Sequence, residues 1–160
     1  MAETAAMAAM ASAPVDARER RLGVALWGRI ARLYGRNLRL AEARLREAGL
    51  SVAQFDALAT IGAHEGIAQR ELAQALLVTQ GAVTQVLDKL EARGLLRRCP
   101  EGRLNRLALT EEGRRLRERV VPDQEDFQAR QFAPLTPAER RELLRLLGKL
   151  QRGQRVGQPR

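Results

Sequence analysis

The stretch QRELAQALLVTQGAVTQVLDKLEARGLLRR, residues 69–98, contains two short helical patterns with almost nothing between them. In the first, QRELAQALL, the apolar residues Leu72 and Leu76 are separated by the spacing of one helix face. The second pattern begins after Thr79, a favoured N-cap residue, and continues to about Arg93. Two short helices joined by so tight a connection predict a helix-turn-helix.

After Gly94 the apolar period changes from that of a helix toward that of a strand. The segments LLRRC and NRLALT flank the turn-rich PEGRL, so the sequence predicts a β-hairpin directly after the helix-turn-helix. Another helix, capped by Ser51, precedes both. The predicted fold class is therefore mainly α with a small β-hairpin wing, which is a winged helix-turn-helix.

Long helices are predicted on both sides of this lobe. A helical pattern runs from Asp16 for about 31 residues to Gly49. Thr110 caps a later helix that Pro122 should kink or divide, and Thr136 opens a final, leucine-rich helix. The first and the last of these helices carry more apolar surface than one small winged helix can cover, which supports a helical dimerisation region.

The same patterns give the domain boundaries. We expect a disordered, alanine-rich N-terminal tail over 1–15, one domain over 16–151 and a flexible C-terminal tail over 152–160. Within the domain, 51–110 is the winged helix-turn-helix lobe, and 16–48 and 111–151 are dimerisation helices.

The composition fits one soluble globular domain, since 45% of the 160 residues are hydrophobic and 29% are charged. A net charge of +9 favours polyanionic partners, nucleic acid before acidic membrane surfaces. The 26 Arg against 2 Lys also fit a bias in genomic base composition, so the charge is only a supporting observation. An aromatic content of 3% disfavours stacking on single-stranded bases and leaves duplexes as the expected partner.

Several function classes are disfavoured by single counts. One cysteine, Cys99, excludes an internal disulfide framework and a multi-thiolate metal site within one chain. One histidine, His64, removes most zinc and Ser-His-Asp schemes, so we expect no enzyme, metal or cofactor. The sequence has no apolar window of ~18 residues for a membrane span. Its N-terminus lacks the basic start of a secretory signal, so we expect a cytoplasmic protein.

The helix that follows Thr79 has two chemically different faces. Its buried stripe is predicted to consist of Val83, Val86, Leu87 and Leu90. The opposite face is polar but mostly uncharged, and its candidate base-contacting residues are Gln80, Gly81, Thr84 and Gln85. Gln can pair with an adenine edge, a Thr methyl can touch a thymine methyl, and Gly allows close backbone approach. Small polar residues are also common on ordinary exposed helices, so this face alone leaves both interpretations open.

Basic residues continue from this helix into the hairpin. The candidate phosphate contacts are Thr79, Lys89, Arg93, Arg97 and Arg98. Arg103, at the tip of the hairpin, is a candidate for the neighbouring minor groove, where narrow A·T tracts deepen the negative potential. The alternative is an arginine that only keeps the turn solvated.

Four short motifs together resemble a known family. The ELA of the first short helix, the LEARGL that ends the second, the EGR of the hairpin and the LTEEG after it occur in the order typical of MarR transcriptional regulators. The resemblance extends from about Leu22 to Leu150. It implies a double-stranded DNA-binding regulator, more often a repressor, that acts as an obligate homodimer on a pseudo-palindromic operator with half-sites ~34 Å apart.

The sequence departs from the family pattern in two places. Ala68 stands where a capping residue usually precedes the ELA helix, which leaves Gln69 as an imperfect substitute. The wing is also short, with only CPEGRLN between its strands, which puts its reach into a minor groove in doubt.

The resemblance also implies a small anionic or phenolic effector. The candidate crevice residues are Trp27, Tyr34, Phe55, Asp56 and His64. For each of them ordinary packing is the stronger interpretation, because pockets are few per protein. Cys99 follows two arginines and suggests a redox switch, but a lone strand cysteine is more often a small hydrophobe.

Two other functions also fit the sequence. A winged helix can serve as a protein-interaction module, for which the base-reading face would be surplus. The chain can also be a non-specific basic DNA-binding protein, which predicts a steep salt dependence and no preference among sequences.

Overall fold

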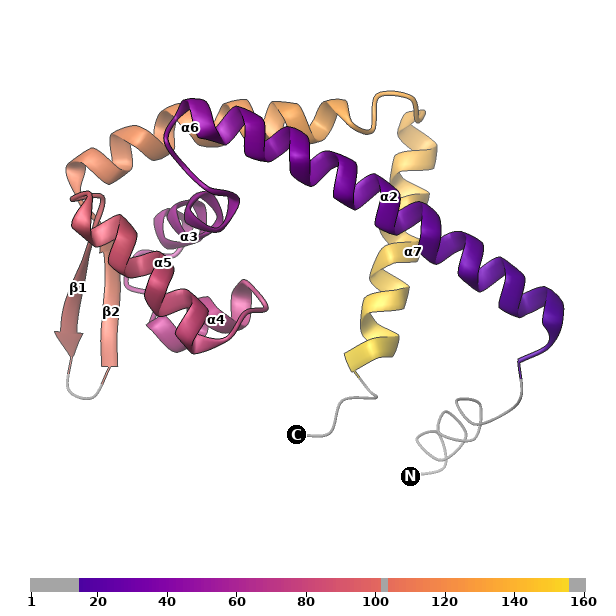
Figure 1. The fold of residues 1–160 in the computed structure, drawn as a ribbon, viewed down its shortest axis with the longest axis horizontal. Helices are drawn as coiled ribbons and strands as arrows, with labels where there is room; N and C mark the ends of the chain where they lie inside the picture. The colour runs from indigo at the N-terminus through magenta and orange to yellow at the C-terminus, as the bar shows by residue number, and fades with distance from the viewer. Residues whose placement is uncertain (1–14, 102–103, 156–160) are drawn as a thin grey trace. The chain divides into compact units, whose positions relative to one another are not determined.

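The computed structural model describes residues 15–101 and 104–155, and the chain within them is mainly helical with one antiparallel hairpin (Figure 1). The elements are α2 (Ala17–Glu47), α3 (Val52–Ala63), α4 (Gln69–Ala75), α5 (Gln80–Ala92), β1 (Leu96–Glu101), β2 (Leu104–Leu109), α6 (Glu111–Arg130) and α7 (Pro137–Arg155). The predicted fold class is confirmed. Arg103 and nearly all of the predicted N-terminal tail lie outside the described residues.

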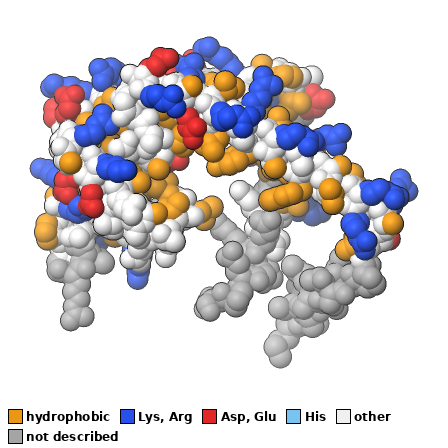
Figure 2. All heavy atoms as spheres, in the orientation of Figure 1, with side chains coloured by type: hydrophobic (Ala, Val, Ile, Leu, Met, Phe, Trp, Pro, Cys, Tyr) orange, Lys and Arg blue, Asp and Glu red, His pale blue; other side chains and the backbone are white. Residues whose placement is uncertain are grey.

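The chain divides into two compact units, one ending at Leu40 and the other beginning at Ala41. The first unit is the N-terminal part of α2. Asp16 caps this helix as predicted, since its Oδ1 accepts hydrogen bonds from the backbone N–H groups of Arg18 and Glu19 at 2.7 and 3.0 Å. Figure 2 shows hydrophobic side chains at the surface of this helix between its arginines.

The core of the second unit lies where α3, α4, α5 and the hairpin meet. Its largest fully buried side chains are Leu58, Ile61, Leu72, Val83, Leu87, Leu90, Leu107 and Leu109. Burying a Leu, Ile or Val side chain contributes about 1.5–3 kcal/mol, so this cluster fixes how α4 and α5 pack. The predicted buried stripe of α5 is confirmed, with Val86 half-buried at its edge.

The turn between α4 and α5 contains an unusual backbone conformation. Leu77 has φ +56°, and it is the only non-glycine residue with positive φ among those the structure describes. Its side chain is 92% exposed, so no packing offsets the cost of that conformation. The turn closes through the backbone N–H of Val78, which donates to the carbonyl of Ala73 at 3.1 Å.

The start of α4 differs from the expectation. Ala68 is its N-cap and offers no side-chain acceptor, but Gln69 does not substitute for one. Instead the Glu71 carboxylate accepts from the backbone N–H of Ala68 at 2.9 Å, which is half of a capping box. The Gln69 side chain extends to α5, where it contacts Thr84. The suggestion that Gln69 replaces the missing cap is therefore wrong.

The hairpin is held against both the helix-turn-helix and α6. Its strands pair from Leu96↔Leu109 to Glu101↔Leu104. Thr110 caps α6 as predicted, accepting from the backbone N–H of Gly113 at 3.1 Å and donating to the carbonyl of Gly94 at 2.6 Å. These bonds fix the hairpin at the end of α5.

The two C-terminal helices differ from the expectation in their extents. α6 continues through Pro122 as one helix, so the predicted division does not occur. Buried Leu116 and Gln124 lie before and after the proline, and their burial holds the helix together where one backbone hydrogen bond is lost. α7 has the predicted Thr136–Glu139 capping box, and it continues to Arg155, beyond the expected boundary at 151. No described helix has an apolar stretch long enough to cross a membrane.

Candidate nucleic-acid interface

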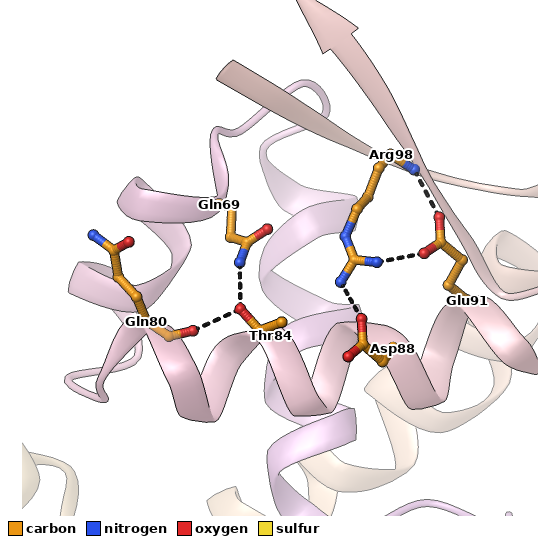
Figure 3. A network of polar contacts seen from close by, with 6 residues as sticks. All are labelled: Gln69, Gln80, Thr84, Asp88, Glu91 and Arg98. Atoms are coloured by element: carbon orange, nitrogen blue, oxygen red, sulfur yellow. Dashed lines mark hydrogen bonds and ion pairs between the residues drawn. The ribbon is translucent and has the colours of Figure 1, made fainter. Parts of the chain in front are cut away.

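The outward side of α5 consists of two stripes with different surroundings. The flanking stripe faces the start of α4 and the strand β1, and it contains Gln80, Thr84, Asp88 and Glu91 (Figure 3). The central stripe is exposed and contains Gly81, Gln85 and Lys89. Among the described residues, the Gln85 and Lys89 side chains have no hydrogen-bonding or ion-pair partner. The face predicted as one surface is therefore partly committed to internal contacts and partly open.

Thr84 belongs to the committed stripe. Its hydroxyl accepts a hydrogen bond from the Gln69 Nε2 amide at 2.7 Å and donates to the Gln80 carbonyl at 2.9 Å. The single hydroxyl proton is thus used within the protein. Thr84 is half-buried, whereas Gln80 is exposed and its side chain extends away from this network (Figure 3).

Arg98 is also held within the protein, although the sequence suggested a phosphate contact. Its guanidinium pairs with Asp88 at 2.7 Å and with Glu91, both on α5, and its side chain is only 20% exposed. Two carboxylates neutralise this cation, and the ion pairs hold β1 against α5 (Figure 3). Helical periodicity cannot predict this arrangement, because the contacts join a helix to the strand that follows it.

The residues in the first turn of α5 are exposed. Thr79 is the N-cap and accepts from the backbone N–H of Ala82 at 3.2 Å, as predicted for a capping threonine. Gly81 follows two residues later, and a methyl group built on its Cα would meet no heavy atom within 4 Å. This turn also presents the unpaired N–H groups and positive dipole end that favour anions.

The remaining cations divide into free and occupied groups. Lys89 and Arg97 are exposed and have no ion-pair partner within 15–101 and 104–155. Arg93 is exposed too, but its Nη1 donates to the carbonyl of Gly49 at 2.7 Å, at the end of α2. Arg70 was missed by the sequence reasoning. It is exposed in the first turn of α4 and lines a shallow hollow together with Thr79, and its position beside the ELA motif was the only available signal.

On β2, Arg106 is paired with acidic side chains. The Nε of Arg106 donates to the Glu101 carboxylate at 2.7 Å, which raises the pKa of Arg106 above its usual value. Its Nη1 donates to the Gly66 carbonyl at 3.2 Å. Cys99 is half-buried on β1 and lies opposite Arg106 in the hairpin register.

The residues predicted for an effector crevice fall into both units. Trp27 and Tyr34 belong to the first unit, where both are exposed. In the second unit Phe55 is part of the buried core, and His64 is an exposed C-cap whose Nδ1 lies 3.2 Å from the Thr60 carbonyl. Asp56 is half-buried, and desolvation raises the pKa of its carboxyl above the ordinary value. No group of three or more potential metal ligands occurs among the described residues.

Comparison with known proteins gives a consistent result. A family model described as the MarR family matches residues 48–103. An uncharacterized HTH-type transcriptional regulator of Bacillus cereus is 32% identical over 127 residues, which cover 79% of this chain and 86% of that protein. The crystal structure of a MarR family transcriptional regulator from Silicibacter pomeroyi shares 33% identity with a TM-score of 0.67, covering 76% of this chain and 84% of that chain.

A MarR family protein of Mycobacterium tuberculosis is similar in two different complexes. Its complex with DNA shares 33% identity with a TM-score of 0.64, covering 78% of this chain and 96% of that chain. Its complex with salicylic acid shares 32% identity with a TM-score of 0.61, covering 76% and 92%.

Proposed function

The chain belongs to the MarR family of transcriptional regulators, and from this premise we propose that it is a homodimeric repressor of a pseudo-palindromic operator, released by a small effector. The family and its relatives are regulators rather than enzymes. The observation that carries the proposal is the pair of exposed, uncharged residues Gly81 and Gln85 on α5, together with exposed Lys89 and Arg97, which have no ion-pair partner among the described residues. DNA sequence is read by groups that distinguish base edges, whereas cations bind the phosphates of every sequence equally well.

Within the proposal, the open residues of α5 read bases. Gln85 is exposed and has no partner among the described residues, so its amide is free to pair with an adenine edge. Gln80 is a second candidate, and Gly81 lets the helix backbone come close to the groove. The similar protein of M. tuberculosis has been solved with DNA, which supports a duplex as the partner.

Phosphate contacts are proposed for groups that are not neutralised internally. These are Thr79, Lys89, Arg97 and the additional residue Arg70. Arg93 contributes less because it is tied to the Gly49 carbonyl, and Arg98 acts by holding β1 against α5. Arg103, which lies outside the described residues, stays the proposed minor-groove contact.

The homodimer is supported by apolar surface on two helices, each considered by itself. In the first unit, α2 exposes the large apolar side chains of Leu22, Val24, Leu26, Trp27, Ile30, Leu33, Tyr34 and Leu40. In the second unit, α7 exposes those of Leu144, Leu146, Leu147 and Leu150. Large apolar side chains exposed along one helix mark an interface, and a second copy of the chain is the simplest partner.

The class of effector is inferred mainly from similar proteins. Because the M. tuberculosis protein binds salicylic acid in its solved complex, we propose a small anionic or phenolic molecule here as well. Trp27 is the only tryptophan of the chain, so its fluorescence can report binding. Quenching by salicylate together with release of DNA supports the proposal, whereas unchanged DNA affinity at saturating salicylate contradicts this effector class.

Selection from a pool of random duplexes tests the proposed function directly. An enriched inverted repeat with half-site centres ~34 Å apart is the expected result for a dimer that inserts one helix per half-site. A pool without enrichment, bound with a steep salt slope, would instead favour the non-specific DNA-binding protein. Failure to bind any duplex at low salt would favour the protein-interaction module.

A further inference from the structure

Thr84 lies on α5, the helix proposed to read the bases, but its hydroxyl is not available as a hydrogen-bond donor to DNA. The oxygen accepts from the Gln69 amide at 2.7 Å, and its proton is donated to the Gln80 carbonyl at 2.9 Å. Both distances are within the normal range for hydrogen bonds. Figure 3 shows the oxygen on the side of Gln69 and Gln80, and the methyl carbon on the other side of Cβ.

This orientation requires a partner beyond the helix itself. In a helix the threonine side chain divides between two rotamers, because its oxygen can reach backbone carbonyls in more than one of them. The Gln69 amide comes from α4, a separate element, and in the observed rotamer it donates to the Thr84 oxygen at 2.7 Å. Gln69 is half-buried at the edge of the core, where α4 packs against α5. Its hydrogen bond therefore selects one of the two orientations.

We propose that Gln69 is a positioning residue for base recognition: by holding the Thr84 hydroxyl inward, it makes Thr84 read a thymine through its methyl group alone. The inference rests on the proposed function, since it needs α5 in a major groove. A methyl group on a protein surface discriminates thymine by contact with the C5-methyl, which no other base of DNA carries. Thr84 and Gln69 together thus add one specificity position to those offered by the open stripe.

The chemistry gives an expected size for the effect. Burying one additional methyl group contributes ~0.8 kcal/mol, which corresponds to about fourfold in affinity for each half-site. Deoxyuridine differs from thymidine only by this methyl group. Replacing the contacted thymine by deoxyuridine in the selected operator should therefore weaken binding of the wild-type chain about fourfold per half-site. The change in affinity on replacing any other thymine should be the same in wild type and in Thr84 variants.

Variants of Thr84 separate its methyl from its hydroxyl. Thr84→Val keeps a methyl and removes the hydroxyl, so it should keep the fourfold loss on deoxyuridine. Thr84→Ser keeps the hydroxyl and removes the methyl, so the two duplexes should bind equally well. The opposite pattern, with the loss kept by serine and abolished by valine, would overturn the proposal because discrimination of the thymine methyl group would then not depend on the methyl group of Thr84.

Variants of Gln69 test its role as a positioning residue. Gln69→Met keeps the side-chain length and removes the donor, and it should reduce the deoxyuridine loss to less than twofold. The same change made in the Thr84→Val background should have no further effect, because valine has no hydroxyl to position. The matched control is Gln74→Met, an exposed α4 glutamine without a side-chain partner in the described part of the chain, which should leave the loss unchanged.

The outcomes distinguish this inference from the function on which it rests. A random-duplex selection without an enriched sequence overturns the proposed function, and this inference with it. An enriched operator at which every thymine gives the same deoxyuridine effect in wild type and Thr84→Ser overturns only the inference. An unchanged fourfold loss in Gln69→Met, with the fold retained by circular dichroism, contradicts the positioning role of Gln69.

Discussion

Replacing Gly81 by alanine should make the protein more stable and its DNA binding weaker. In the free protein the added methyl group meets no heavy atom within 4 Å, and Gly81 lies in the first turn of α5. Alanine has the higher helix propensity, so the free energy of unfolding should rise by about 0.5 kcal/mol, the lower end of the range for helix interiors. Urea denaturation of the two proteins measures this difference.

Binding should change in the opposite direction, because Gly81 lies on the open stripe of α5 that is proposed to approach the bases. Overpacking a close contact by one methyl group costs about 1–3 kcal/mol, or roughly 5- to 150-fold in affinity for each half-site. Fluorescence anisotropy with the selected operator measures the loss.

The matched control is Gly153→Ala on α7, where an added methyl group also meets nothing within 4 Å. This variant should gain stability without losing affinity. If Gly81→Ala binds as tightly as wild type, the first turn of α5 does not approach the DNA closely, and the reasoning that places Gly81 in the groove is refuted.

Four further substitutions test other parts of the interface and of the fold. Arg98→Ala should weaken DNA binding by loosening β1 from α5, and it should leave the dependence of log affinity on log salt concentration, the salt slope, unchanged. Arg97→Ala should lower this slope by about 0.9 for each phosphate that Arg97 neutralises. Equal slope changes for the two variants in salt titrations would show that Arg98 contacts phosphate. Leu77→Gly should raise the free energy of unfolding by about 0.5–1 kcal/mol, since it relieves a positive φ at an exposed side chain, and a lower urea midpoint would contradict this. Asp56→Asn should stabilise the protein at neutral pH. Burial raises the pKa of the Asp56 carboxyl in the folded protein above the ordinary value of 3.8. The free energy of unfolding of wild type therefore falls as the pH rises from 3.8 through the raised pKa of the folded state. Thermal melts should show the advantage of the Asp56→Asn variant shrinking as the pH falls toward 3.8, and a constant advantage would rule out titration of Asp56 as its source.

Local signals in the sequence were sufficient for the elements of the fold. Ser51, Thr79, Thr110 and Thr136 were predicted as helix caps, and each one accepts the expected backbone hydrogen bond. The buried stripe of α5 and the hairpin were also predicted from periodicity, because both depend on residues close together in the chain. A helix cap depends only on residues of its own helix, and a buried stripe depends only on its helix and on an apolar surface to pack against.

The contacts that distinguish the residues of the site were not predictable in the same way. Helical spacing placed Thr84 and Gln85 on one polar face, but it could not show that Gln69 reaches Thr84 from α4. It also could not bring Arg98 of β1 onto Asp88, since that contact depends on how the strand leaves the helix. Of the two outcomes expected at Pro122, a kink or a division, the division does not occur, because burial on both sides outweighs the absence of one backbone hydrogen bond.

The central claim is that the uncharged residues of the central stripe of α5, Gly81 and Gln85, supply sequence preference, while the cations bind phosphates without regard to sequence. The most direct measurement is the affinity of wild type and Gln85→Ala for the selected operator and for a scrambled duplex of equal length, over a series of salt concentrations. We predict that Gln85→Ala loses about 1–3 kcal/mol of the preference for the operator per half-site and keeps the salt slope of wild type. An unchanged preference, or a preference lost only together with the salt slope, would contradict this claim.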